Sequence, residues 1–198
     1  MNLILASASP RRRELLTQAG FTFEVHPAHI PENPLPNEDP IAYVTRLARQ
    51  KAEAVFNEIT KTSARDKRVS VPTQVVLGAD TTVTLDSQIL GKPENEADAA
   101  RMLRLLCGRT HLVITGVAVV TAARTEVAAE VTAVRFLTLS EQDIAAYIAT
   151  GEPMDKAGAY AIQGLAARWI PRIEGDYFNV VGLPISLVST LLESISPL

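Results

Sequence analysis

Short apolar runs and segments with helical spacing alternate along the whole sequence, and this alternation constrains the fold more than any other feature. Residues 3–6 are consecutive apolar residues followed by turn-forming residues, which predicts a buried strand. Residues 41–55 instead place apolar side chains every three or four positions, which predicts an amphipathic helix. Because both patterns recur up to the end of the sequence, we expect an α/β fold with a mixed central sheet flanked by helices.

The remaining elements are predicted from the same patterns and from residues that begin or end helices. Ser9, Asn95 and Ser140 are the expected N-caps of three helices, because their side-chain oxygens can accept from backbone N–H groups. A hairpin is expected around residues 86–88. The further strands expected are residues 21–25, 75–77, 111–121, 126–137 and 169–173. The further helices expected are residues 10–19, 97–106, 140–150 and 184–195.

Length, charge and cysteine content narrow the class of protein. A chain of 198 residues can form one substantial domain or two small lobes around a cleft. A net charge of −3 disfavours general nucleic-acid binding, so a phosphate ligand needs a local cationic cluster. The single cysteine, Cys107, excludes an intrachain disulfide and disfavours a thiolate metal site. Since no signal peptide or membrane span is predicted, we expect a cytoplasmic protein that does not bind membranes.

Three adjacent arginines, Arg11, Arg12 and Arg13, fall in the first turn of the first predicted helix, where the helix dipole disfavours cations. A bound anion would remove this conflict, since it takes hydrogen bonds from backbone N–H groups and guanidinium groups together. Ser7 and Ser9 add hydroxyl donors. Successive helical side chains point about 100° apart, so at most two arginines face one ligand. We expect these to be Arg11 and Arg12; the alternative is a charged turn that faces solvent.

Asp80 follows a predicted buried strand, within the sequence Gly-Ala-Asp-Thr. Carboxylates at the carboxyl ends of strands line ligand crevices in α/β sheets. In such a crevice Asp80 could bind a hard cation or act as a general base toward water. The residues alone leave another interpretation open, in which Asp80 only stabilises a turn beside glycine.

Three further charged residues can be interpreted either as ligands or as solvated surface groups. Lys92 lies in the rigid turn Gly91-Lys92-Pro93, and Lys51 lies on the polar face of the second predicted helix. Either lysine could neutralise a phosphate. Glu32 lies in an irregular, proline-rich loop at residues 27–40, and long ordered loops are often functional.

Residues 155–164 combine small side chains with Gln163, whose amide can both donate and accept hydrogen bonds. This combination suits recognition of a nucleobase edge. The alternative is a tight loop containing a salt-bridged Asp155–Lys156 pair. The sequence has no nucleophile-elbow, P-loop or dinucleotide-binding motif, which disfavours a serine hydrolase, a P-loop NTPase and a dinucleotide-dependent enzyme.

The order of these segments resembles that of the Maf family. The opening motif of the family corresponds to residues 5–16, LASASPRRRELL. The later motifs correspond to residues 78–81, 91–93, 108–116, 152–164 and 175–184. The resemblance covers nearly the whole sequence, and its strength lies in the order and spacing of the motifs.

Several properties follow from the resemblance. Family members hydrolyse nucleoside triphosphates to the monophosphate and pyrophosphate with a divalent metal, Mg²⁺ or Mn²⁺, and are thought to clear non-standard or excess nucleotides. The resemblance implies an elongated mixed α/β fold with a deep cleft, similar to inosine-triphosphate pyrophosphatases. It further implies one domain over residues 1–198, with two lobes around the cleft, and suggests a homodimer.

The resemblance also assigns roles to individual residues. The proton acceptor of the family corresponds to Asp80. Positions tied to substrate choice correspond to Arg11, Thr81 and Gln163. Polar positions around the phosphates correspond to Ser7, Arg12, Lys51 and Lys92. The carboxylates assigned to the metal are Glu32 and Asp80.

The motif DKAGAYAIQG at residues 155–164 resembles the family branch that acts on dTTP and UTP. Ala161 stands where the family usually has glycine, and Pro31 replaces a frequent acidic residue before Glu32. The alternatives are the branch that acts on 7-methylguanosine triphosphate, and a nucleotide-binding regulator of septum formation without turnover.

Overall fold

The computed structural model describes residues 2–63 and 74–195. Within them, seven strands form one sheet in the order β2-β1-β3-β5-β6-β7, with β4 paired to β3. Their bounds are β1 (Asn2–Leu5), β2 (Phe23–Val25), β3 (Gln74–Leu85), β4 (Gln88–Leu90), β5 (Thr110–Val120), β6 (Thr125–Arg135) and β7 (Arg172–Glu174). β1 is parallel to β2 and β3, while the other pairings are antiparallel. The predicted mixed sheet is therefore confirmed.

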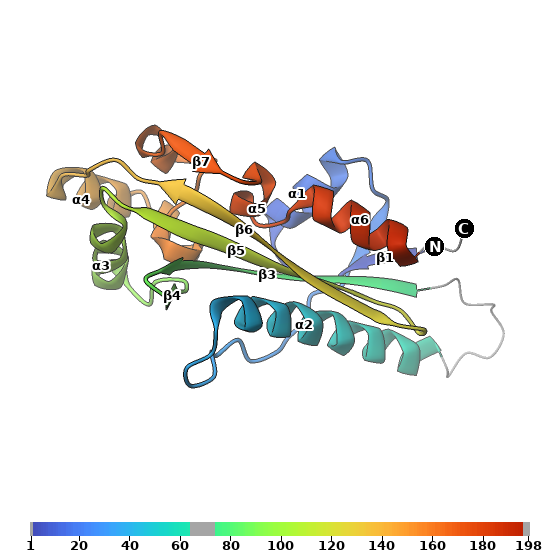
Figure 1. The fold of residues 1–198 in the computed structure, drawn as a ribbon. Helices are drawn as coiled ribbons and strands as arrows, with labels where there is room; N and C mark the ends of the chain where they lie inside the picture. Colours follow the sequence, from blue (N-terminus) through green and yellow to red (C-terminus); the bar gives the residue numbers. More distant parts are fainter. Residues whose placement is uncertain (1, 64–73, 196–198) are drawn as a thin grey trace.

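Helices cover both faces of this sheet. They are α1 (Pro10–Gln18), α2 (Pro40–Ser63), α3 (Glu96–Leu106), α4 (Glu141–Ala149), α5 (Tyr177–Val181) and α6 (Ile185–Ile195). Short 3-10 helices are η1 (Glu152–Asp155), η2 (Ala157–Ala159) and η3 (Leu165–Trp169). Figure 1 shows α2 along one face, α1, α5 and α6 on the other, and α3 and α4 near one end. The long strands β3, β5 and β6 thus connect all parts of the core.

Two glycines let α2 lie unusually close to the sheet. A Cβ atom on Gly78 of β3 would lie 2.1 Å from the Ala48 carbonyl oxygen, and one on Gly116 of β5 would lie 2.4 Å from that of Val44. Any side chain at either position would push the helix away. Side chains two residues apart share a face of a strand, so Asp80 also faces α2.

Asp80 lies in the middle of β3, and the prediction that it follows the end of a strand was wrong. The sequence suggested a break at Gly78, but this glycine accommodates α2 and the strand continues to Leu85. β1 pairs with β3 only as far as Leu77, and β4 joins the same edge at Val83. In the described residues no strand covers the β3 edge between these two points, so a crevice can form there.

The predicted helix caps are confirmed by hydrogen bonds. The hydroxyl of Ser9, the amide oxygen of Asn95 and the hydroxyl of Ser140 each accept from a backbone N–H group three residues later. Helix α5 and the 3-10 helices were not predicted, and Trp169 belongs to η3 instead of a strand. The predicted exposed connection at residues 60–73 is helical up to Ser63, and its remainder lies outside the described residues.

None of the helices in the described part of the chain combines the length and the apolar character needed to cross a membrane.

Candidate active site

A cavity of about 710 Å³ opens at the uncovered edge of β3. All nine predicted site residues line it: Ser7, Arg11, Arg12, Glu32, Lys51, Asp80, Thr81, Lys92 and Gln163. They come from six separate segments, which are the turn before α1 with α1 itself, the loop before α2, α2, β3, the turn after β4 and the loop after η2. Residues distant in sequence thus meet where β1 and β4 leave β3 uncovered.

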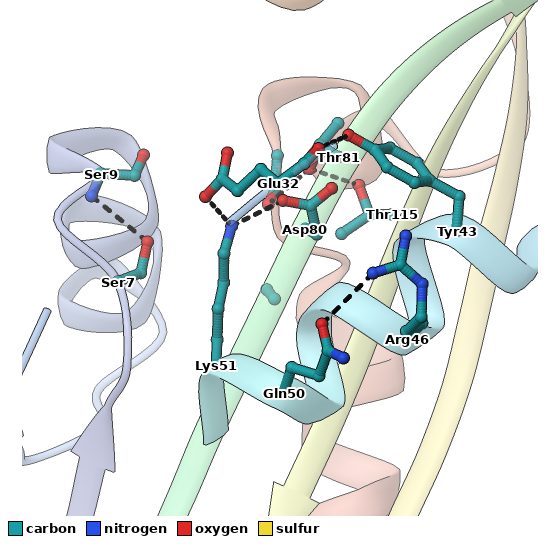
Figure 2. A network of polar contacts seen from close by, with 12 residues as sticks. Ser7, Ser9, Glu32, Tyr43, Arg46, Gln50, Lys51, Asp80, Thr81 and Thr115 are labelled. Atoms are coloured by element: carbon teal, nitrogen blue, oxygen red, sulfur yellow. Dashed lines mark hydrogen bonds and ion pairs between the residues drawn. The ribbon is translucent and has the colours of Figure 1, made fainter. Parts of the chain in front are cut away.

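The ammonium group of Lys51 lies between two carboxylates (Figure 2). Its Nζ atom is 2.7 Å from Asp80 Oδ1 and 2.6 Å from Glu32 Oε1. Lys51 and Asp80 are both buried, each with 7% of its surface exposed. Burial raises the pKa of Asp80 above its ordinary value, although the charges of Lys51 and Arg12 oppose this shift. A carboxylate with a raised pKa is better suited to accepting a proton near neutral pH than an ordinary one.

Glu32 reaches this cluster from the proline-rich loop. The loop is held by Tyr43 of α2, whose hydroxyl donates to the Glu32 carbonyl oxygen at 2.8 Å. Burial would raise the pKa of the Glu32 carboxyl, but its hydrogen bond and charge contact with Lys51 lower it below the usual value. Burial, together with the negative charges of Asp80 and Glu32, raises the pKa of Tyr43 to about 12, so its hydroxyl stays a donor. Glu32 is therefore ionised where it meets Lys51.

Arg12 is buried and donates to four protein acceptors. Its Nε donates to the Gly182 carbonyl oxygen at 2.8 Å, and Nη1 donates to the Ala79 carbonyl oxygen at 2.8 Å and to Ser7 Oγ at 3.2 Å. Its Nη2 donates to Thr81 Oγ1 at 3.0 Å. Burial lowers the pKa of Arg12. A guanidinium group has five N–H donors, so these contacts use most of its capacity.

The remaining predicted residues lie at the open side of the cavity. Arg11 is half-buried, with Nη1 3.9 Å from Asp155 Oδ2, while Lys92 and Gln163 are exposed. Of the three adjacent arginines, Arg11 and Arg12 line the cavity, whereas Arg13 is exposed and is not among the lining residues. The cavity thus combines a buried carboxylate, that of Asp80, with two cationic side chains that are half-buried or exposed, those of Arg11 and Lys92.

Other residues in and beside the cavity were given no role in the site from the sequence. Tyr43 and Lys156 line the cavity, and Lys156 contacts the Asp155 carboxylate. Thr115 of β5 shares a hydrogen bond with Thr81, Oγ1 to Oγ1 at 2.9 Å. Gly182 follows α5 and supplies the carbonyl that Arg12 bonds. Lys156, Thr115 and Gly182 fall within motifs already noted in the sequence, and Tyr43 does not. The contacts of Thr115 and Gly182 could not be predicted, because they depend on strand pairing and chain reversal.

The donor set fits a divalent cation delivered with a polyphosphate. Across residues 2–63 and 74–195, no cluster of three or more His, Cys, Asp or Glu side chains could hold a metal ion. Glu32 and Asp80 nevertheless converge on one cation, the Lys51 ammonium group. Mg²⁺ is commonly held by one or two carboxylates together with substrate phosphates. Two convergent carboxylates beside a cationic cavity meet that description.

The chain is similar to several known proteins. A family model described as Maf-like protein matches residues 2–195. The dTTP/UTP pyrophosphatase of Koribacter versatilis is 52% identical over 193 residues, which cover 98% of this chain and 94% of the relative. The dTTP/UTP pyrophosphatase of Geobacter sulfurreducens is 50% identical and that of Bacillus pumilus is 47% identical, with coverage of 99% and 97% of this chain and 97% and 95% of the relatives.

A solved structure, that of the Staphylococcus aureus Ham1 protein, is similar over 99% of this chain and 100% of the Ham1 chain, with a TM-score of 0.45 and 12% identity.

Proposed function

This chain belongs to the Maf-like protein family, and from this membership we propose that it hydrolyses nucleoside triphosphates, preferably dTTP and UTP, to the monophosphate and pyrophosphate. One observation supports the proposal independently of the names of the relatives. A buried carboxylate, that of Asp80, lies in a cavity that is also lined by cationic side chains. A polyphosphate needs such cations, and hydrolysis needs a proton acceptor beside them.

Asp80 accepts the proton of the attacking water in this proposal. The water oxygen bonds to the α-phosphorus, the bond from the α-phosphorus to the bridging oxygen breaks, and pyrophosphate leaves. The raised pKa of Asp80 supports this assignment, because burial makes its carboxylate a stronger base. Lys51 keeps the carboxylate ionised and oriented through the 2.7 Å contact.

Glu32 and Asp80 are proposed to hold the divalent cation, Mg²⁺ or Mn²⁺. When bound, such a cation neutralises the triphosphate and polarises the phosphorus–oxygen bond under attack. Lys51 stays beside both carboxylates, where its ammonium group can also donate to a phosphate oxygen.

The cationic residues divide into two groups. Lys92 and Arg11 have exposed or half-exposed head groups, and we assign them to the phosphates and to substrate choice. Ser7 supplies a hydroxyl at the turn before α1. Arg12 is assigned mainly to positioning, since its donors already bond Ser7, Thr81 and backbone oxygens.

Pyrophosphate release from a nucleotide panel tests the proposal. The panel contains dTTP, UTP, dCTP, dATP, dGTP and 7-methylguanosine triphosphate, each with Mg²⁺, with Mn²⁺ and with EDTA. We expect release from dTTP and UTP with either metal, and none with EDTA. Nucleotide binding without any release would instead favour a regulator, and preference for the methylated guanosine nucleotide would assign the chain to the other branch.

A further inference from the structure

A buried tyrosine and a glutamate form a polar pair directly behind the loop that carries Gln163. Tyr147 lies in α4 with 1% of its surface exposed, and Glu152 is the first residue of η1. The Tyr147 hydroxyl donates to Glu152 Oε1 at 2.7 Å. Neither residue is among those that line the cavity in the described chain, so their contribution to the site is indirect.

The pair holds both ends of the Gln163 loop. On one side of Gln163, the backbone N–H of Ala161 donates to the Tyr147 hydroxyl at 3.2 Å. On the other side, the backbone N–H of Leu165 donates to both carboxylate oxygens of Glu152, at 3.1 and 3.2 Å. Residues 161–165 are therefore attached at two points to one hydroxyl–carboxylate pair.

The residue after Gln163 shows how closely the carboxylate approaches the loop. A Cβ atom on Gly164 would lie 2.1 Å from Glu152 Oε1, so a side chain at this position would displace the carboxylate from its contacts with the loop. The Gly164 backbone N–H donates to the Ala161 carbonyl oxygen at 3.1 Å and closes a tight turn around Gln163. The backbone on both sides of Gln163 is thus held in a turn that contacts Glu152.

Tyr147 is itself rigid. Its ring packs edge-on against Trp169 with ring centroids 5.3 Å apart, within the core cluster formed with α3 and α4. Because core packing already orders the Tyr147 ring, its hydroxyl can hold the loop without a further loss of side-chain conformational entropy.

We propose that Tyr147 and Glu152 are positioning residues that hold Gln163 in the orientation that recognises the nucleobase. The inference rests on the proposed function and on the role in substrate choice that the family resemblance implies for Gln163. A thymine or uracil edge presents a donor between acceptors, whereas a cytosine edge presents a different order, so a fixed amide can distinguish them. An amide that is free to rotate can turn its oxygen or its NH₂ group toward either base, and would therefore distinguish them less.

Measurements of equilibrium binding separate recognition of the nucleobase from the rate of hydrolysis. Dissociation constants for dTTP and dCTP are measured by calorimetry with Mg²⁺ in an Asp80→Asn background, which is expected to bind without turnover. In this background, Tyr147→Phe and Glu152→Ala should each reduce the preference for dTTP over dCTP about 5- to 10-fold, the size of one hydrogen bond. Glu152→Gln keeps an acceptor oxygen and should retain most of the preference.

Turnover in the chain that keeps Asp80 gives a second measurement. Loss of base recognition should raise KM for dTTP about 5- to 10-fold and leave kcat within about twofold, as expected when uniform binding is removed. A role limited to stability would lower the active fraction and hence the apparent kcat, with KM and base preference unchanged. Glu174→Ala, which removes an exposed carboxylate elsewhere, is the matched control.

The Gln163→Ala background decides whether the pair acts through Gln163. Adding Tyr147→Phe or Glu152→Ala to Gln163→Ala should cause no further loss of base preference. A further loss, an unchanged preference in the single variants, or no preference for dTTP in the starting chain would each overturn the inference. If the starting chain binds dTTP selectively but releases no pyrophosphate when Asp80 is present, the proposed reaction fails while the binding measurements still decide the role of Tyr147 and Glu152.

Discussion

The two faces of β3 hold polar groups in opposite ways at Asp80 and Thr81. On the face toward α2, Asp80 and Glu32 share one ammonium group, that of Lys51. On the other face, Thr81 bonds Arg12, whose remaining contacts are to Ser7 and to two backbone oxygens.

This difference distinguishes reactive charged groups, which can exchange partners with a ligand, from structural charged groups, which support the fold. A carboxylate that shares a cation can exchange partners when a ligand brings charge of its own. A guanidinium group bonded to fixed protein oxygens cannot do so without breaking the fold. The adjacent positions of Asp80 and Thr81 therefore place the proposed chemistry and its support on opposite faces of one strand.

The largest expected effect is on the reactive face. Asp80→Asn keeps the shape of the side chain but removes its basicity, so kcat for dTTP should fall about 10³-fold, within the range for a general base. The dissociation constant for dTTP should change only a few-fold. Asp86→Asn, an exposed aspartate in the β3–β4 turn, is the control and should leave turnover unchanged. Near-normal turnover by Asp80→Asn would exclude Asp80 as the base.

Arg12→Ala tests the structural face. Removing the guanidinium group takes away the side-chain donor to the buried Ala79 carbonyl oxygen and leaves the Gly182 carbonyl oxygen with only the Thr81 hydroxyl at 3.3 Å, so the free energy of unfolding should fall by about 3 kcal/mol. Arg12→Lys should not restore stability, because one ammonium group cannot span these acceptors. The exposed neighbour gives the control: Arg13→Ala should change stability by less than about 0.5 kcal/mol in chemical denaturation. Equal effects at the two arginines would contradict the comparison of the faces.

Lys51→Met should shift the pH dependence of turnover. The positive charge of Lys51 opposes the burial that raises the pKa of Asp80, so its removal raises this pKa further. A base works only when deprotonated, and activity is therefore lost as the pH falls through the pKa of Asp80. The acid limb of kcat/KM should move to higher pH by about one unit. Lys61→Met, in the last turn of α2, should leave the limb in place.

The smallest effect is expected at Glu32, which is half-exposed. Glu32→Gln should lower the free energy of unfolding by less than about 1 kcal/mol, because solvent screens exposed ion pairs. The Mn²⁺ concentration for half-maximal turnover should nevertheless rise several-fold, since one proposed metal ligand loses its charge. Glu38→Gln, which breaks the pair with Arg46 outside the cavity, serves as the control. An unchanged metal requirement would remove Glu32 from the proposed metal site.

The starts of the capped helices and the positions of most strands could be predicted because their signals are local, whereas the C-terminal end of α2 was not predicted. Ser9, Asn95 and Ser140 cap helices with their own side chains, and Ser140 also forms a capping box with Asp143. Helix α5 was missed because five residues carry too little periodicity to detect. The assignment of residues 1–198 to one domain and the suggested homodimer stay predictions.

The sequence predicted which residues belong to the candidate site, but it did not predict which of them contact one another. Gly78 was interpreted as a strand end, whereas its function is to admit the backbone of α2 at Ala48. No local pattern distinguishes these cases, since a glycine required by a neighbouring helix looks the same in sequence as one in a turn. Likewise, nothing near Tyr147 or Glu152 indicates that they meet behind Gln163.

The sequence by itself determined the alternating elements, the family to which the chain belongs and the set of charged residues available for a polyphosphate. These depend on the identity and spacing of residues along the chain. Only the tertiary structure decided which charges meet. It left the edge of β3 uncovered between β1 and β4, directed Asp80 toward Lys51, and enclosed Arg12 among protein oxygens. The physical reason is that burial and pairing, which separate reactive from structural charge, arise from contacts between segments far apart in sequence.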